Sequence, residues 1–289
     1  MLAVNQDTPE ALVNNVVHLI SLPTVYTRLE EILKNPEHTR NDIAEVINID
    51  PALCARILRI INSSYYGLPN TIQSINLAVN LIGEYDLRNM VLITSVINAM
   101  EALLDHGIDM PVFWRHSIRC GISARLMAKL TATPDPELLF LIGLLHDLGQ
   151  LIIYKNEPEL SATVAWHVLN ENKKRYQIEA SLLGFDHAMV GALLAETWGL
   201  PSKLNDIIKY HHQPDRSTYA QETKLICLAD QLAHLLELNN NALNSHIEHL
   251  PIPITRSLQN LHIQKDQILA LLSDVLEQSQ SIEEIICDA

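Results

Sequence analysis

The chain has 289 residues, of which 48% are hydrophobic and 19% charged, so its composition is that of a globular protein with a substantial core. Its net charge of −14 and the lack of a basic run exclude a surface built to bind the phosphate backbone of DNA or RNA. A protein this acidic can still bind a nucleotide through a local metal site.

The cysteines and the first residues indicate the environment of the protein. The N-terminal residues 1–17 lack the basic segment and long apolar core of a signal peptide, and no run reaches the roughly 18 apolar residues of a membrane span. We therefore expect a protein of the cytoplasm that makes no membrane contact. No CxxC pair is present, and buried free thiols are expected at the widely spaced Cys54, Cys120, Cys227 and Cys287.

Helical patterns follow one another along the chain, and no segment alternates in the manner of a β-strand. The pair Asp50-Pro51 caps and opens a predicted helix over residues 52–63, and Ser74 caps another over residues 75–82. Further helices are predicted over residues 86–100, 112–130, 136–155, 158–174, 176–183, 187–198, 202–212 and 219–238.

A loop near residues 105–111 is the predicted seam between two helical halves. The N-terminal half covers residues 1–105, and the half that carries the candidate site covers residues 106–250. A helical tail over residues 251–289 follows a break marked by two prolines. The fold class expected from these patterns is all-α.

The most informative segment is apolar on every side from Leu138 to Ile153, except at His146, Asp147 and Gln150. A helix that is hydrophobic all round is a buried helix. An isolated ionised carboxylate is so costly there that it must be paired, hydrogen-bonded or bound to a metal. Asp147 therefore predicts a buried polar site beside His146.

Several other polar side chains fall on apolar faces of predicted helices, as judged by their spacing from apolar neighbours. They are His116, His187, His211, His212 and Asp230. A single inward histidine is usually an ordinary core residue, and an inward aspartate is usually a hydrogen-bond partner. Seven such groups together need a common partner, and a divalent cation is the simplest one. Ordinary roles are assigned to His167, His234, His246, His249 and His262.

Imidazole and carboxylate donors suit iron, manganese, zinc or nickel better than calcium or magnesium alone. Asp147 lies between two sets of imidazoles and is suited to bridging two ions about 3.5–4 Å apart. Such a pair would lower the pKa of a water between the ions and hold a phosphate, which is phosphoester hydrolysis chemistry. The sequence predicts a mono- or dinuclear transition-metal site with the ligands His116, His146, Asp147, His187, His211, His212 and Asp230.

The order of His116, then His146-Asp147, then Asp230 resembles the H…HD…D pattern of the HD superfamily of metal-dependent phosphohydrolases. The additional histidines, at position 187 and at positions 211–212, are similar to the fuller set of its two-metal members. Those members include the HD-GYP cyclic-dinucleotide phosphodiesterases.

The closer resemblance is to the HDOD family, the HD-related output domain of bacterial signalling, and it covers roughly residues 15–240. It implies an all-α, HD-domain-like helical bundle with an N-terminal helical subdomain, and signalling through contacts with a protein partner. The motifs that carry it follow in order as Leu22-Pro23, Asp50-Pro51-Ala52-Leu53, Arg59–Ser63, Gly67-Leu68-Pro69, Ile75–Gly83, Trp114–Ser117, Gly143–Gly149, Asp186-His187-Ala188, Trp198–Pro201 and His211–Pro214.

Three features depart from the pattern of active HD hydrolases. Gln150 stands where these enzymes commonly carry a lysine, and Val112 stands where some three-metal relatives carry a glutamate. The paired histidines run into residues 213–217 (QPDRS) and not into a GYP sequence. The ligand set is kept, while the groups that would assist catalysis are missing.

These observations favour a regulatory HDOD module that retains a metal site and acts through protein contacts. An exposed Tyr65-Tyr66 turn would take part in those contacts, unless the two tyrosines pack in the core beside the turn. A weaker possibility is a purely structural metal site, because metal binding can supply folding free energy.

The alternative is a metal-dependent phosphohydrolase that acts on a nucleotide or a cyclic dinucleotide. His146 and Asp147 would then be catalytic, and Arg115 or Arg119 would contact the phosphate. The sequence leaves open whether the protein is an enzyme, and it does not specify the oligomeric state.

Overall fold

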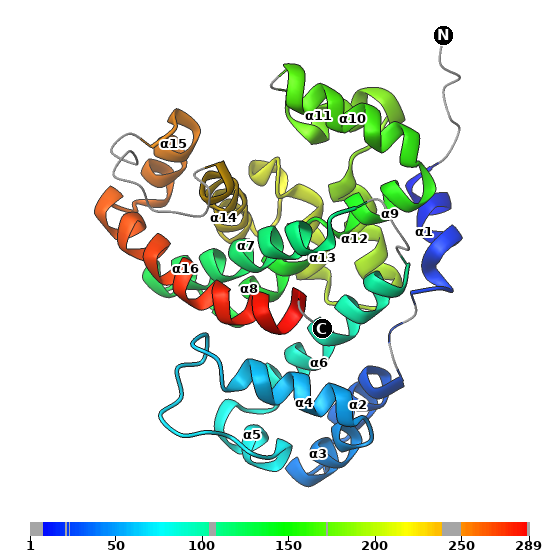
Figure 1. The fold of residues 1–289 in the computed structure, drawn as a ribbon, viewed down its shortest axis with the longest axis vertical. Helices are drawn as coiled ribbons and strands as arrows, with labels where there is room; N and C mark the ends of the chain where they lie inside the picture. The colour runs from blue at the N-terminus through cyan, green and yellow to red at the C-terminus, as the bar shows by residue number, and fades with distance from the viewer. Residues whose placement is uncertain are drawn as a thin grey trace.

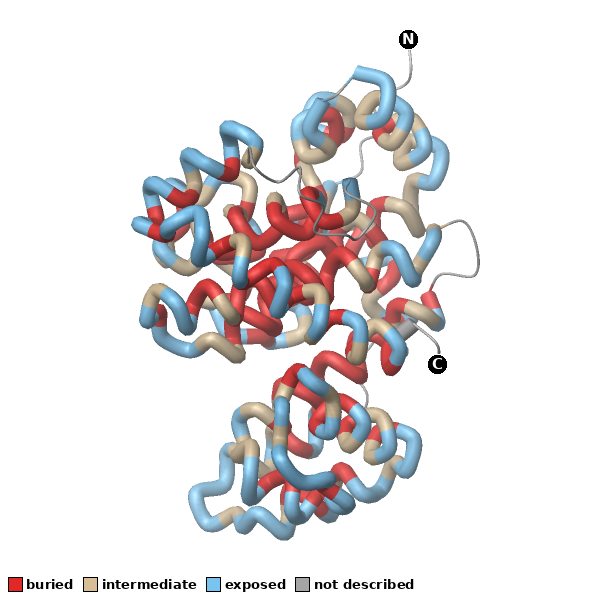
Figure 2. The backbone as a smooth tube through the Cα atoms, turned by 60° about the vertical axis from the view of Figure 1, so that its left-hand side comes forward, coloured by how far each residue is buried: buried red, intermediate tan, exposed pale blue. Residues whose placement is uncertain are grey.

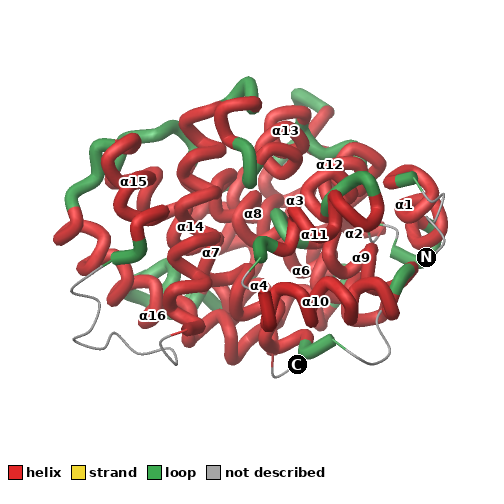
Figure 3. Tube along the Cα trace, turned by 90° about the horizontal axis from the view of Figure 1, so that it is seen from above, coloured by secondary structure: helices red, strands yellow, loops and turns green. Residues whose placement is uncertain are grey.

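The computed structural model describes residues 8–20, 22, 24–103, 108–171, 173–238 and 250–287, and every regular element in these ranges is a helix (Figure 3). The predicted all-α class is confirmed. In chain order the elements are α1 (Pro9–Val17), α2 (Thr24–Lys34), α3 (Arg40–Asn48), α4 (Pro51–Ile61), α5 (Ile75–Ile82), α6 (Glu84–Leu103), α7 (Met110–Leu130), α8 (Pro136–Leu145), α9 (Leu148–Asn156), α10 (Pro158–Glu171), α11 (Arg175–Leu183), α12 (His187–Thr197), α13 (Ser202–Tyr210), the single 3₁₀ turn η1 (Pro214–Arg216), α14 (Ala220–Leu238), α15 (Ile252–Leu261) and α16 (Lys265–Cys287).

Helices α2 to α5 form a lobe at one end of the molecule, and the long helix α6 joins it to the main bundle (Figure 1). The predicted caps are present at the start of α4 and of α5. The Asp50 carboxylate accepts hydrogen bonds from the backbone N–H groups of Ala52 and Leu53 at 3.0 Å, and the Ser74 hydroxyl caps α5. Gly83 then ends α5 with a φ of +86°, a conformation that favours glycine.

The main bundle is centred on α7, which packs against α8, α14 and α16. A second layer is formed by α9, α12 and α13, and α1 also packs there, against α9 and α12. Buried residues are concentrated in the middle of this bundle, and a smaller group fills the lobe (Figure 2). The tail helix α16 packs on α7 and also contacts α4 of the lobe.

The prediction of a single helix over residues 136–155 is wrong, because this segment forms two helices. Helix α8 ends at Leu145 and α9 begins at Leu148, so His146 and Asp147 occupy the break between them. Asp147 has φ −101° and ψ 4°, outside the helical region. A uniformly apolar stretch gives no periodicity that would have revealed this break.

Tyr65 is 3% exposed, so of the two alternatives for the Tyr65-Tyr66 turn, packing in the core is the one that holds for this residue. Its hydroxyl donates a hydrogen bond to Glu137 Oε2 at 2.7 Å, and its ring lies 4.2 Å from the Arg125 guanidinium. Arg125 in turn donates to Glu137 Oε1 at 2.6 Å. The turn of the lobe is thus inserted against α7 and α8 of the bundle.

The helical stretch of residues 136–156 is long and apolar enough to span a membrane, but 83% of its apolar segment is buried inside the protein. Burial in the core accounts for its apolar composition. The predicted seam at residues 105–111 lies partly outside the described residues. Cys54, Cys120 and Cys227 are free thiols, and of these Cys120 is fully buried.

Candidate metal centre

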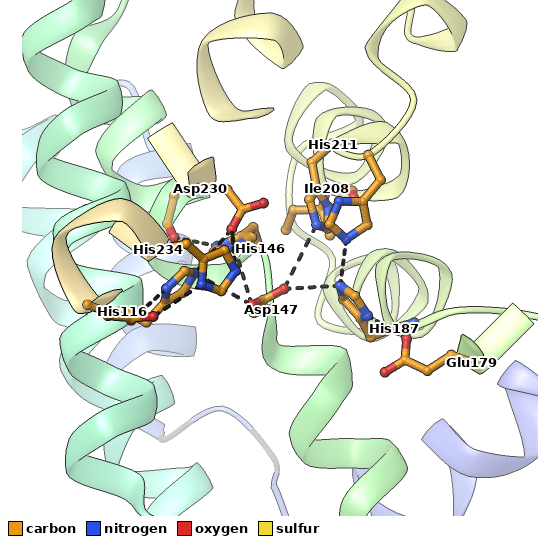
Figure 4. Close-up of polar contacts among 12 residues, drawn as sticks. His116, His146, Asp147, Glu179, His187, Ile208, His211, Asp230 and His234 are labelled. Atoms are coloured by element: carbon orange, nitrogen blue, oxygen red, sulfur yellow. Dashed lines mark hydrogen bonds and ion pairs between the residues drawn. The ribbon is translucent and has the colours of Figure 1, made fainter. Parts of the chain in front are cut away.

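The seven predicted ligands come together from five helical regions in the middle of the main bundle (Figure 4). They are His116 in α7, His146 and Asp147 at the α8–α9 break, His187 at the start of α12, His211 and His212 directly after α13, and Asp230 in α14. Six of them are buried, and His212 is partly buried. Their assignment as metal ligands remains a prediction, and the geometry below describes what the cluster can hold.

Asp147 lies at the centre of the cluster, and its two oxygens face different groups. Its Oδ2 atom lies 3.4 Å from His146 Nε2 and 3.8 Å from His116 Nε2. Its Oδ1 atom lies 3.1 Å from His187 Nε2 and 3.9 Å from His211 Nε2. One carboxylate therefore connects two groups of donors, as a ligand that bridges two ions would.

We call these groups the first and second half-sites. The first half-site comprises His116, His146 and Asp230 on the Oδ2 side of Asp147, where Asp230 Oδ1 lies 3.3 Å from His116 Nε2. The second half-site comprises His187, His211 and His212 on the Oδ1 side. In the second, the Nε2 atoms of His212 and His187 are 2.9 Å apart, and the His212 ring stacks on Tyr176.

Two of the histidines are oriented by backbone carbonyl groups. The Nδ1 atom of His146 bonds to the carbonyl of Gly143 at 2.7 Å, and that of His211 bonds to the carbonyl of Ile208 at 2.7 Å. Because a carbonyl only accepts, each Nδ1 carries the proton and donates it. The Nε2 atom of each neutral ring is then a free lone pair directed at the cluster.

Two further histidines are oriented by carboxylates. The Nδ1 atom of His187 donates to Glu179 Oε2 at 2.5 Å, and that of His116 donates to Glu237 Oε1 at 2.9 Å. A metal-binding histidine typically donates its second ring nitrogen to a carboxylate or carbonyl, which fixes the ring and strengthens it as a ligand. All four oriented histidines have this arrangement.

The buried Nε2 atoms of His116, His146 and His211 have no hydrogen-bond partner among the described residues. Leaving a buried polar atom without a partner costs about 1–3 kcal/mol. Ligands about 2.1 Å from a tetrahedral zinc ion lie about 3.4 Å from one another. The 3.1–3.9 Å separations around Asp147 match that spacing, so the donor set fits a divalent transition-metal ion on each side.

The electrostatics of the two half-sites differ. Burial disfavours the charged form of His116, but Asp230 and Glu237 outweigh it and raise its pKa to about 10. Burial lowers the pKa of His211 to about 4, and the neighbouring His146 and His187 add to this effect. Burial also opposes ionisation of Asp147, yet the surrounding imidazoles hold its pKa well below the usual range. Asp147 is therefore an anion at neutral pH.

Two glycines allow the helices to approach closely enough for these contacts. A Cβ atom on Gly149 would lie 2.0 Å from the carbonyl oxygen of His187, and one on Gly143 would lie 2.6 Å from the Cα of Gly121. Neither position has room for a side chain without movement of the backbone. Backbone contact thus sets the distance between α8 and α7 and the distance between α9 and α12.

Three residues at the site were not found from the sequence. Glu179 contacts His187 across the turn between α11 and α12, and no spacing rule marks such a pair. Glu237 and His234 lie seven and four residues after Asp230 on α14, so helical periodicity could have indicated both. His234 was expected to be an ordinary histidine, whereas its Nε2 atom lies 3.3 Å from Asp230 Oδ1.

Phosphate contacts at Arg115 and Arg119 remain a prediction. Both guanidinium groups pair with Glu283 of α16, with Arg115 Nε at 3.3 Å and Arg119 Nε at 3.0 Å. An arginine neutralised by a glutamate is a poor phosphate ligand. These side chains connect α7 to the tail helix.

The fold and the cluster together define an HD-type helical domain. A family model of the HDOD domain matches residues 19–214, and the chain belongs to the HDOD domain family. An uncharacterized protein of Treponema pallidum (strain Nichols) is 25% identical over 205 residues, which are 70% of this chain and 39% of that protein. This chain therefore aligns with only about two fifths of the relative's length.

Two solved structures are similar over almost the whole chain. One is a candidate phosphohydrolase from Shewanella amazonensis SB2B, with 25% identity and a TM-score of 0.76, covering 95% of this chain and 97% of that one. The other is an HDOD domain protein of unknown function from Geobacter sulfurreducens, with 25% identity, a TM-score of 0.73 and the same coverage. The similarity extends beyond residue 214 and includes helices on both sides of the cluster.

Proposed function

We propose that this protein is a cytoplasmic bacterial signalling module in which a divalent-metal centre holds five helical regions together and the output passes through protein contacts. The observation that carries the proposal is the set of buried, partnerless Nε2 atoms arranged on either side of the anionic Asp147. Iron, manganese, zinc or nickel suits these donors. One or two ions would link α7, α12, α14 and the segments around His146 and His211.

Two observations favour regulation over catalysis. The ligands other than His212 are at most 8% exposed, so a cyclic dinucleotide would have to displace part of the protein to reach them. Gln150 cannot transfer a proton as a lysine would, and Arg115 and Arg119 are already neutralised by Glu283. The described residues provide donors for a metal, while the two arginines predicted to contact a phosphate are both paired with Glu283.

A metal-dependent phosphohydrolase is the second candidate, because a single carboxylate joins two complete groups of donors. A pair of bound cations would activate a water and clamp a phosphate. In that case Asp147 would bind one ion through each carboxylate oxygen, and Glu179 would orient His187. The substrate class would be a nucleotide or a cyclic dinucleotide.

Metal analysis by mass spectrometry on anaerobically purified protein, followed by a phosphodiester assay, separates these functions. The regulatory proposal expects about two transition-metal equivalents and no hydrolysis of bis(p-nitrophenyl) phosphate or cyclic dinucleotides. Hydrolysis that disappears in Asp147→Asn would establish the enzyme instead. Protein that stays metal-free after reconstitution would reject both functions.

The variant Gln150→Lys tests whether one position disables catalysis. Hydrolysis gained by this variant, with metal content unchanged, would identify an enzyme scaffold whose proton-transfer group has been replaced. We expect no gain, because Arg115 and Arg119 remain paired with Glu283. Gln150→Met is the matched control, since it has a similar length and cannot transfer a proton.

A further inference from the structure

His234 extends from α14 at the edge of the first half-site, one helical turn after Asp230. Its Nε2 atom lies 3.3 Å from Asp230 Oδ1, the same oxygen that His116 Nε2 approaches to 3.3 Å. The His234 side chain is 61% exposed, whereas that of His116 is 8% exposed. His234 lies beside His116 and Asp230 (Figure 4), and its exposure places it on the solvent side of the half-site.

A single carboxylate orients both of these imidazoles. Glu237 Oε1 accepts a hydrogen bond from His116 Nδ1 at 2.9 Å, and its Oε2 accepts one from His234 Nδ1 at 3.1 Å. The two rings lie 4.4 Å apart with a tilt of 39°. Glu237 thus holds His234 as a metal ligand is typically held, by a carboxylate on the ring nitrogen remote from the ion.

The orientation directs two Nε2 atoms at one carboxylate oxygen, each at 3.3 Å. A proton on each Nε2 satisfies this arrangement, and so does a single cation held by both lone pairs and the carboxylate. The 3.3 Å separations are close to the spacing of about 3.4 Å between ligands of one tetrahedral ion. A surface pair of His234 with Asp230 alone would contribute only about 0.3–0.5 kcal/mol and would not need the shared Glu237.

We propose that His234 is a further metal ligand of the first half-site and closes it from the solvent side. The inference rests on the metal centre proposed above. Together with His116, His146, Asp147 and Asp230 it makes five protein donors to one ion. Catalytic zinc sites keep a position open for water or substrate, whereas closed sites are structural. His234 would occupy such an open position, and it is the donor that solvent can reach and displace.

The test uses the full chain loaded with cobalt(II), whose visible absorption reports the ligands of the ion. His234→Ala should keep one ion with wild-type affinity and bind the other at least about tenfold more weakly, with a changed spectrum. Added imidazole should restore the spectrum, because it can enter the exposed space that the side chain leaves. Glu237→Gln should weaken binding of the same ion about 10- to 100-fold, because the Glu237 carboxylate orients both histidines.

His167→Ala is the matched control, because His167 forms a similar contact with Glu171 on α10, at 2.9 Å, away from the cluster. It should leave both ions and the spectrum unchanged. If the His234→Ala protein binds both cobalt ions with wild-type affinity and spectrum, the inference is overturned while the metal centre stands. If the wild-type protein binds no cobalt, the proposed function fails and His234 has no ion to complete.

Discussion

Two buried clusters of charged and polar side chains in the described part of the chain differ in how completely their hydrogen-bonding groups are paired. At the contact between the lobe and the bundle, the Tyr65 hydroxyl and the Arg125 guanidinium are both bonded to the Glu137 carboxylate. In the candidate metal centre, by contrast, the Nε2 atoms of His146 and His211 have no hydrogen-bond partner among the described residues.

The comparison shows that burial of charge does not by itself indicate a ligand site. A cluster whose donors and acceptors match is a structural contact, and a cluster in which several oriented acceptors converge on one point is suited to bind a cation. Asp86, which lies near the Glu137 cluster, has its pKa raised to about 6 by burial and by Glu137. Asp147 is buried more deeply, yet its imidazole neighbours keep its pKa low.

The largest effect is expected from Asp147→Asn, which keeps the shape of the side chain and removes its charge. Both ions should be lost, because each half-site uses one of the carboxylate oxygens. An ion present at 100 times its Kd contributes about 2.7 kcal/mol, so losing two lowers the free energy of unfolding by about 5 kcal/mol. Metal analysis and thermal denaturation measure the two effects.

Asp215→Asn is the control for this variant, since Asp215 is exposed and pairs only with Lys224 among the described contacts. It should leave metal content and thermal stability as in the wild type. If the Asp147→Asn protein still held two full equivalents of metal, Asp147 would not be a bridging ligand.

Arg125→Met should destabilise the protein without changing its metal content. The substitution leaves the partly buried Glu137 carboxylate with only the longer contact to Lys129 at 3.9 Å, and breaking a buried pair costs about 3 kcal/mol. Urea denaturation measures this change, with Arg216→Met on the exposed turn η1 as the control. Loss of metal together with stability would mean that the two clusters are not independent.

Glu179→Gln should act on one half-site only. Glu179 Oε2 accepts hydrogen bonds from both the backbone N–H and Nδ1 of His187, so the amide should weaken the second-half-site ion about 10- to 100-fold. Competition with a chromophoric chelator measures the two affinities separately. Glu222→Gln, which alters a contact with Lys203, is the control. An equal loss of both ions would show that the half-sites are not distinct.

The smallest effect is expected from Asp86→Asn, and it depends on pH. The pKa of Asp86 is raised in the folded protein to about 6 from the ordinary value of 3.8, so wild-type stability falls as the pH rises between these values. The variant should therefore be more stable above pH 6 by on the order of 1 kcal/mol, after allowance for solvent screening. Below pH 4 the two proteins should unfold alike, and a difference that persists there would contradict the assignment.

Local chemistry and periodicity were enough to predict much of the fold and the position of the main donors. Asp50 and Ser74 act as helix caps because their neighbours leave backbone N–H groups to satisfy, which is visible in the sequence. His116 and Asp230 are inward because their helices have an apolar face. The order of the HD-type residues then indicated that these helices meet.

The features that were missed depend on contacts between distant segments or on segments whose apolar residues show no helical periodicity. The break at His146 could not be located because the surrounding residues are apolar on all sides. The pairing of Arg119 with Glu283 joins residues 164 positions apart, and no local pattern signals it. Exposure and core packing both stayed open for Tyr65, since the sequence does not show that Glu137 and Arg125 enclose it.

The tail helix α16 has a consequence for regulation because one turn of it contacts both parts of the molecule. Ser281 contacts Ser64 of the lobe, and two residues later Glu283 binds two arginines of α7. A partner that binds the lobe and shifts α16 would change the affinity of the first half-site, to which α7 contributes His116, for its ion. Thermodynamic reciprocity then requires the ion to change the affinity for that partner by the same factor.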